Sequence, residues 1–139
     1  MANLIRWATD ADVTRIFEIR SNAGENKLDD PARVTVEDVR SFIADTGMFV
    51  CEDGEKIVGF SAADTRDGSI WALFVDPAYE GRGIGRALFE QACAVLRQAG
   101  FEQLWLTTDR GTRAERFYRA AGWQVTSIRG NELVFETVR

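Results

Sequence analysis

The chain has 139 residues, of which 45% are hydrophobic and 28% charged, so we expect one globular domain over residues 1–139 with a core that needs no disulfide bonds. It contains no histidine, which excludes Ser-His-Asp and Cys-His nucleophile pairs and the usual zinc sites. A net charge of -5 argues against nucleic acid binding, and no apolar run is long enough to cross a membrane. The two cysteines suggest neither a disulfide framework nor a metal site, so we expect a reduced, cytoplasmic setting. We expect the protein to be a monomer or a homodimer.

The sequence pattern in the first third of the chain predicts a strand followed by two helices. Residues 3–7 have the pattern of a strand, and Asp10 is expected to cap a helix with apolar residues at helical spacing. Thr35 begins the second helix, with Asp38 three residues later in an arrangement similar to a capping box. Gly47 is expected to end this helix.

Three strands follow, connected by short turns. Residues 48–52 and 56–64 are expected to form a hairpin, because Asp53-Gly54 between them is a strong turn signal. Residues 66–68 then turn the chain into an apolar strand over residues 70–75.

The second half of the chain alternates helices and strands. Residues 83–100 are expected to form a long helix, and residues 101–107 a strand covered on both faces, because its centre is apolar throughout. We expect a shorter helix over residues 112–121. Residues 123–128 and 132–138 are expected to form a terminal hairpin. The long helix is expected to pack on the core through a stripe of residues at helical spacing: Ile84, Leu88, Ala92, Val95 and Ala99.

The glycine-rich segment after the apolar strand predicts an anion site. Gly81, Gly83 and Gly85 alternate just before and at the start of the long helix. Glycine permits positive φ angles and the close approach of a ligand, and the free N–H groups at a helix start suit a phosphate. Local positive charge is expected from arginines of the second half of the chain: Arg82, Arg86, Arg110, Arg113, Arg116 and Arg119.

Known phosphate-binding motifs narrow the choice of anion. Arg86 occupies the position of the third glycine of a Rossmann fingerprint, and no Lys-Ser or Lys-Thr pair follows the loop as in a Walker motif. The remaining pattern, Val-x-Pro followed by Gly-x-Gly over residues 75–85, resembles the coenzyme A loop of the GNAT superfamily of N-acetyltransferases. Residues 114–123, Ala-Glu-Arg-Phe-Tyr-Arg-Ala-Ala-Gly-Trp, resemble a second segment of the same family.

The resemblance covers nearly the whole chain and implies a fold and an activity. The expected order, β-α-α-β-β-β-α-β-α-β-β, is that of the GNAT fold, an α+β (layered α/β) architecture with a mixed, mostly antiparallel central sheet flanked by helices. It implies an enzyme that uses acetyl-CoA, without a metal, to acetylate a small amine or a peptide amine by direct attack. A non-catalytic acyl-CoA-binding or regulatory module of the same fold is the alternative.

Site residues of the family carry over to matching positions. By this resemblance Tyr118 protonates the leaving thiolate, and the N–H of Leu73 contacts the acetyl carbonyl. The helix pattern alone would make Tyr118 a packing residue. The coenzyme is expected to contact residues of the apolar strand and the glycine loop: Phe74, Val75, Gly81, Arg82, Gly83, Ile84, Gly85 and Arg86.

Three positions depart from the family pattern. Glu80 stands where Arg or Gln is usual, and we expect it to point outward and to pair with Arg82 or Arg86. Gly111 stands where many members have an asparagine that helps to hold the coenzyme, and Ser69 stands where some members have a catalytic glutamate. The general base therefore stays open between several candidates: Asp64, Asp67, Glu25, an ordered water, or none if the amine arrives neutral.

Acceptor recognition is expected in the polar loop over residues 20–31 and near the turn at residues 64–68. Glu25, Asn26 and Asp29 suit an ammonium group, and Trp71 would supply an aromatic wall. The plainer interpretation is a solvated acidic surface for the loop residues and core packing for Trp71.

Overall fold

The computed structural model describes residues 4–22 and 35–137 and confirms the predicted mixed architecture. The described residues form a seven-stranded sheet with the order β1-β2-β3-β4-β5-β7-β6. Neighbouring strands are antiparallel except β4 and β5, which are parallel. The strands are β1 (Leu4–Trp7), β2 (Met48–Asp53), β3 (Lys56–Asp64), β4 (Ser69–Val75), β5 (Trp105–Asp109), β6 (Gln124–Arg129) and β7 (Glu132–Glu136).

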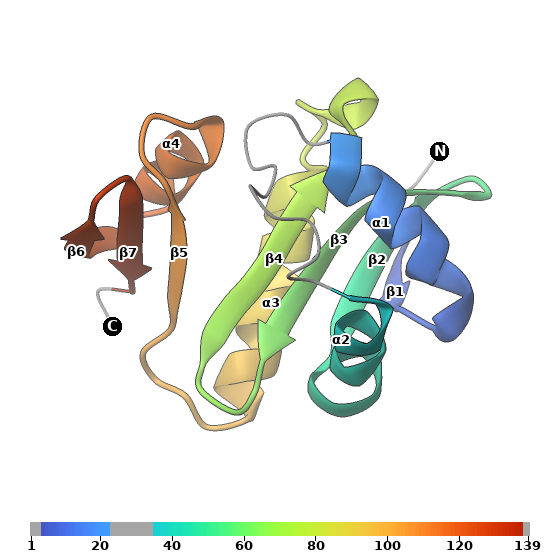
Figure 1. Cartoon of the computed structure of the whole chain (residues 1–139), viewed down its shortest axis with the longest axis horizontal. Helices are drawn as coiled ribbons and strands as arrows, with labels where there is room; N and C mark the ends of the chain where they lie inside the picture. Colours follow the sequence, from blue (N-terminus) through green and yellow to red (C-terminus); the bar gives the residue numbers. More distant parts are fainter. Residues whose placement is uncertain (1–3, 23–34, 138–139) are drawn as a thin grey trace.

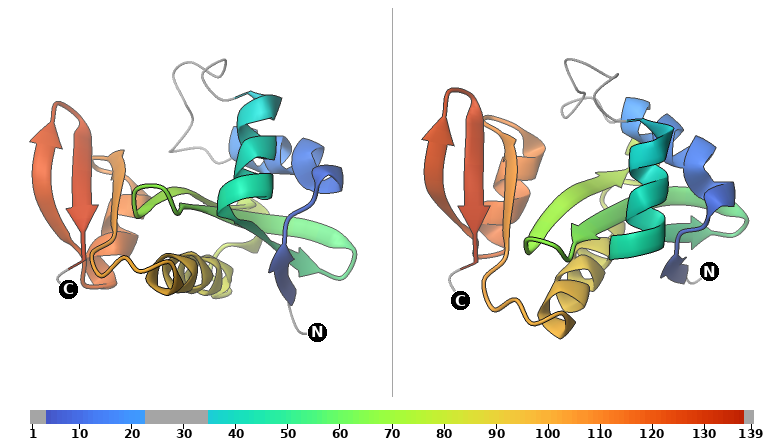
Figure 2. Two further views of the ribbon diagram at one scale, coloured as in Figure 1. Left: turned by 90° about the horizontal axis from the view of Figure 1, so that it is seen from below. Right: turned by 60° about the horizontal axis from the view of Figure 1, so that its bottom comes forward.

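Helices cover both faces of the sheet (Figure 1). Figure 2 shows α1 and α2 on one face of the first four strands and α3 on the other. No helix among the described residues is long and apolar enough to cross a membrane. The helical elements are η1 (Asp10–Asp12), α1 (Val13–Asn22), α2 (Val36–Ser41), η3 (Phe42–Thr46), η4 (Pro77–Tyr79), α3 (Ile84–Gln98) and α4 (Arg113–Ala120).

Three apolar clusters hold these layers together, one of which packs the start of α3 on β2 and β3. The first lies between the sheet and the α1–α2 layer, with Ile16 and Phe60 almost fully buried. The second joins α3 and α4 to the later strands, with Leu96 and Phe135 fully buried. Gly59 on β3 permits the close approach of α3, because a Cβ there would lie 2.9 Å from a methyl carbon of Leu88.

The sheet opens between β4 and β5. Their pairing is recorded at one position, Ser69 opposite Trp105, and beyond it the two strands diverge (Figure 1). The closed end is held by Trp105, whose backbone N–H donates to the Gly68 carbonyl at 3.3 Å and whose indole N–H donates to the Asp67 carbonyl at 3.0 Å. The opening therefore widens toward the C-terminal ends of both strands.

The N-terminal cap of α2 agrees with the prediction from the sequence, whereas the cap of the first helical turn differs from it. At α2, the Thr35 hydroxyl accepts from the Asp38 N–H at 3.1 Å, and the Asp38 carboxylate accepts from the Thr35 N–H at 3.0 Å, as predicted. The prediction that Asp10 caps the first helix is wrong, because Thr9 is the N-cap residue of η1. The Asp12 carboxylate accepts from the Thr9 N–H at 2.8 Å, which fixes the start of the turn one residue earlier.

Two boundaries in the second half also differ from the sequence prediction. β5 begins at Trp105 and is not covered on both faces, because Thr107 is exposed and Trp105 only half-buried. The helices α1 and α2 cover the other half of the sheet (Figure 2), so in the described part of the chain one face of β5 has no helix over it. The predicted stripe of α3 ends too late at Ala99, which is exposed; the buried side chains are Ile84, Leu88, Phe89, Ala92 and Leu96.

Candidate active site

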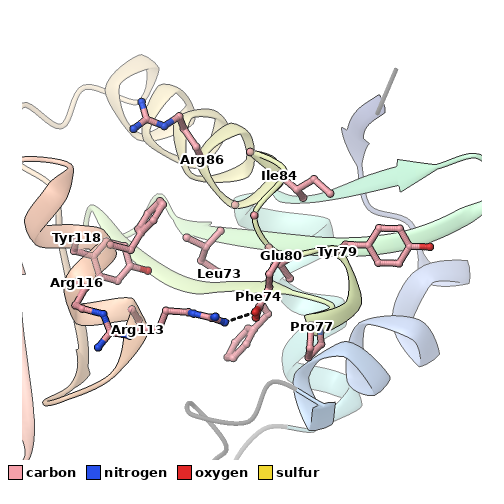
Figure 3. A pocket seen from close by; sticks show the side chains of 16 residues that line it. Leu73, Phe74, Pro77, Tyr79, Glu80, Ile84, Arg86, Arg113, Arg116 and Tyr118 are labelled. Atoms are coloured by element: carbon pink, nitrogen blue, oxygen red, sulfur yellow. Dashed lines mark hydrogen bonds and ion pairs between the residues drawn. The ribbon is translucent and has the colours of Figure 1, made fainter. Parts of the chain in front are cut away.

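A pocket of about 960 Å³ lies where β4 and β5 diverge, between β4, the glycine loop, the start of α3 and helix α4 (Figure 3). Most residues predicted to bind the coenzyme or act in catalysis line it: Leu73, Phe74, Val75, Gly81, Gly83, Ile84, Gly85, Arg86 and Tyr118. Side chains that the sequence analysis did not assign to the site also line it: Pro77, Tyr79, Glu80, Arg113, Ala114, Arg116 and Phe117.

The β4 wall of the pocket presents backbone groups as well as side chains. On its β3 side the strand is paired along the pocket wall, with Leu73 opposite Ser61 and Val75 opposite Gly59, and the register shifts between Ala62 and Ala63. On its β5 side the pairing ends at Ser69, so the backbone groups that face β5 beyond this residue have no strand partner among residues 4–22 and 35–137. An extended ligand can bind such an edge in the way that an added strand does.

The glycine loop is held in place by the turn before it. The Asp76 carboxylate accepts from the Ala78 N–H at 3.0 Å and from the Arg15 guanidinium at 2.7 Å, which ties η4 to helix α1. Its backbone bond with Ala78, together with the Arg15 bond, lowers the pKa of Asp76 although partial burial acts in the opposite direction. The carboxylate therefore stays ionised near neutral pH.

Two of the three glycines adopt the backbone conformation that favours glycine. Gly81 has φ 81° and Gly83 has φ 82°, and a Cβ at either position would meet no atom within 4 Å. Glycine is therefore favoured at these two positions by the backbone conformation and not by a lack of space for a side chain. Gly85 lies inside α3 without a positive φ, where a Cβ would be 3.6 Å from a Val75 methyl carbon. The expectation of a positive φ holds for the first two glycines and not for Gly85.

The start of α3 faces the pocket and has the features of an anion site. Gly83 is its N-cap residue and makes no side-chain cap, so the first N–H groups of the helix have no side-chain acceptor at that position. Arg86 adds positive charge in the first turn, and Arg113 and Arg116 approach from α4 (Figure 3). Arg82 does not line the pocket; its guanidinium lies 5.0 Å from the centre of the Tyr79 ring.

Glu80 has a different partner from the expected one. It lines the pocket and pairs with Arg113 of α4, and no bond to Arg82 or Arg86 is recorded among the described residues. The expectation that Glu80 points outward toward these two arginines is therefore wrong. Arg113 is brought to the loop by the fold, 33 positions later in the chain, and local spacing gave no signal for this contact.

Tyr118 is both a packing residue and a pocket residue. It is 6% exposed, and its ring lies within 5.3 to 6.3 Å of four aromatic rings: Phe89, Phe117, Trp123 and Phe135. Figure 3 shows its hydroxyl directed toward the pocket. Burial, and to a smaller extent the neighbouring Cys93, raises the pKa of Tyr118 above its ordinary value. Burial also raises the pKa of the Cys93 thiol to about 11, so both groups are neutral at physiological pH.

The candidate bases described by the structure are engaged in other bonds. Asp64 accepts two hydrogen bonds from the Arg66 side chain at 2.8 and 3.0 Å, and these lower the pKa of its carboxyl group. Asp67 accepts from the Ser69 hydroxyl at 2.7 Å. Gly111 has φ 81° and donates its N–H to Glu115 at 2.7 Å, so this loop closes on α4 through its backbone.

Predicted acceptor residues fall mostly outside the described part of the chain, as Glu25, Asn26 and Asp29 do. Trp71 is half-buried and does not line the pocket. Its ring stacks on Phe42 with 4.2 Å between centres and an angle of 18°. This contact joins β4 to the core beneath α2, in agreement with the packing interpretation.

The sheet order, the opening between β4 and β5, and the glycine loop at the start of α3 define an acetyltransferase fold. The sequence profile of the acetyltransferase (GNAT) family matches residues 13–123, which is most of the chain. The chain belongs to the GNAT acetyltransferase family.

Relatives support this membership. The chain is 33% identical over 133 residues to an N-acetyltransferase of Archaeoglobus fulgidus, covering 73% of this chain and 89% of that protein. It is 32% identical over 107 residues to the mycothiol acetyltransferase of Propionibacterium freudenreichii, covering 68% of this chain and 34% of that enzyme. The chain thus spans about a third of the length of that curated relative.

Solved structures share the fold over the full chain. The PaiA N-acetyltransferase of Thermoplasma acidophilum, in complex with coenzyme A, superposes with a TM-score of 0.87 at 16% identity and covers 99% of each chain. The ribosomal-protein-S18-alanine N-acetyltransferase of Escherichia coli gives 0.80 at 20% identity, covering 98% of this chain and 93% of that one. Because the sequence identities to these two proteins are low, the superpositions show a shared fold and nothing further.

Proposed function

We propose that this protein is an N-acetyltransferase that moves an acetyl group from acetyl-CoA to a primary amine by direct attack. One observation carries the proposal: a single pocket joins an unpaired edge of β4, an anion site at the start of α3 and the hydroxyl of Tyr118. A coenzyme A thioester has an anionic diphosphate, an extended amide-bearing arm and a sulfur atom in that order. The residues present fit all three parts.

The two ends of the pocket would hold different parts of the donor. Main-chain N–H groups between Gly81 and Gly85, with Arg86, suit the diphosphate. The free edge of β4 suits the pantetheine arm, which would bring the thioester between Leu73 and Tyr118. Holding both reactants in one orientation is a large part of the rate enhancement available to this reaction.

Tyr118 would act as a hydrogen-bond donor to the leaving sulfur. In the reaction a C–N bond forms, the C–S bond breaks, the amine loses a proton and the thiolate gains one. Because its pKa is raised, Tyr118 stays protonated and can donate to the developing negative charge on sulfur. Complete transfer of its proton would be costly for the same reason, so its main contribution is stabilisation of the thiolate.

A neutral amine would complete the reaction without a strong protein base. Asp64 is held by Arg66 with a lowered pKa, and Asp67 is bonded to Ser69, so neither is a strong base among the described residues. The acetylated amine would then lose its proton to water. The turnover should therefore depend on how much of the acceptor is unprotonated.

A thiol-release assay tests the proposed function. We expect purified protein and acetyl-CoA to release free coenzyme A when a suitable amine is added from a panel of small amines, amino acids, aminoglycosides and peptide N-termini. Mass spectrometry should find an acetyl group on the nitrogen of the acceptor. Binding of acetyl-CoA without release for any amine would instead favour a non-catalytic acyl-CoA-binding module.

The pH dependence of turnover is expected to lack a decline at moderately alkaline pH. The pKa of Tyr118 lies above its ordinary value of 10.0, so the protonated hydroxyl persists where an exposed tyrosine would ionise. The turnover should rise as the amine loses its proton and stay high to about pH 10. Chromatographic assays across this range check it, and a decline centred below about pH 10 at constant folded fraction would contradict it.

A further inference from the structure

An ion pair joins the two sides of the pocket. Glu80, directly after η4, contacts Arg113, the first residue of α4 (Figure 3). The two side chains are 36% and 62% exposed, so the pair lies where the pocket meets solvent. Both residues also line the pocket, so a ligand that fills it has to meet this pair.

The charge around the pair is otherwise positive. Among the described lining residues, Glu80 is the acidic one, and the basic ones are Arg86, Arg113 and Arg116. Arg113 also stands in the first turn of α4, where the helix dipole disfavours a cation unless an anion is near. Glu80 supplies that anion, and it occupies space in a site with basic side chains on two sides.

A phosphate group is a stronger partner for Arg113 than this carboxylate. Exposed ion pairs are weak and are screened by salt. The diphosphate of coenzyme A and its 3′-phosphate each carry more negative charge than one carboxylate, and their oxygens match the fork of N–H donors that a guanidinium presents. An anionic ligand can therefore replace Glu80 at Arg113, but only by breaking the ion pair that Glu80 makes with Arg113.

We propose that Arg113 binds a phosphate group of coenzyme A and that Glu80 competes with this phosphate for Arg113. The inference rests on the proposed function, because it assumes that the pocket takes the coenzyme. Glu80 then sets the affinity: it weakens binding of the coenzyme and favours its release after transfer. Arg113 adds selectivity for ligands that carry the phosphate.

Titration calorimetry on four proteins tests the coupling of these residues: wild type, Glu80→Gln, Arg113→Gln and the double variant. We expect Glu80→Gln to bind coenzyme A about three- to tenfold more tightly and Arg113→Gln about five- to tenfold more weakly. In the double variant the gain from Glu80→Gln should largely disappear, because the carboxylate acts through Arg113.

Two matched variants control for net charge. Glu90→Gln removes one exposed carboxylate of α3 outside the pocket lining, and Arg119→Gln removes an arginine of α4 that pairs with Glu115 away from the lining. Both should leave the Kd of coenzyme A within about twofold of wild type. Raising the salt concentration should reduce the effect of Glu80→Gln.

Dephospho-coenzyme A, which lacks the 3′-phosphate, identifies the phosphate that Arg113 takes. Arg113→Gln should weaken the binding of coenzyme A alone if Arg113 binds the 3′-phosphate, and the binding of both ligands if Arg113 binds the diphosphate. Either result supports the proposal.

Unchanged affinity for coenzyme A in Glu80→Gln and Arg113→Gln, with tight binding by wild type, would overturn this inference alone. An undiminished Glu80→Gln gain in the double variant would overturn the competition. A wild-type protein that does not bind the coenzyme would overturn the proposed function as well.

Discussion

Replacing Tyr118 with phenylalanine should lower kcat by about 100-fold while leaving the Kd of acetyl-CoA nearly unchanged. The substitution removes one oxygen and keeps the ring, which packs among Phe89, Phe117, Trp123 and Phe135. The lost hydroxyl is the group that would donate to the thiolate, and this interaction strengthens only as the C–S bond breaks. Interactions realised mainly in the transition state affect kcat more than ground-state binding.

The measurement is a steady-state assay combined with titration of acetyl-CoA. Tyr79→Phe is the matched control, because Tyr79 is the other tyrosine of the chain and its hydroxyl points away from the pocket in Figure 3. It should change kcat by less than about twofold. Equal turnover of wild type and Tyr118→Phe would remove Tyr118 from the mechanism and leave the family membership untouched.

Replacing Phe89 with alanine should lower the free energy of unfolding by about 3–5 kcal/mol. Phe89 is 6% exposed, and its ring centre lies 5.3 to 5.6 Å from the rings of Phe117, Tyr118 and Trp123. It is therefore the point at which α3 contacts α4 and the turn after it. The cavity left by alanine loses these contacts, and neighbouring side chains can fill it only in part.

Urea denaturation measures this loss, with two further variants for comparison. Phe89→Leu keeps most of the volume and should cost about 1–2 kcal/mol. Ile128→Ala removes a side chain that is 56% exposed and should change stability by less than about 0.5 kcal/mol. A loss near 1 kcal/mol in Phe89→Ala would mean that the aromatic cluster does not stabilise the second half of the sheet.

Local signals in the sequence predict the turns and several helix ends. Asp53-Gly54 gives the hairpin of β2 and β3, and Thr35 with Asp38 gives the cap of α2, because the responsible atoms lie within a few residues of one another. The glycine loop is predictable for the same reason: its backbone conformation is set by the absence of side chains at Gly81 and Gly83.

Errors arise where contacts between distant segments decide the structure. Thr9 caps the first helical turn because Asp12 bonds to its N–H and to Arg6, whose guanidinium also bonds to Glu52 of β2. The partner of Glu80 comes from α4, which no local spacing indicates. For the same reason the sequence shows a surplus of arginines in the second half but not which of them reach the pocket.

A crystal structure of the protein with coenzyme A bound tests the central claim most directly. The diphosphate should lie against the main-chain N–H groups between Gly81 and Gly85, and the pantetheine arm should follow the free edge of β4 toward Tyr118. The sulfur atom should lie within hydrogen-bonding reach of the Tyr118 hydroxyl. Density for the coenzyme at another surface, or an empty pocket at saturating coenzyme, would contradict this account.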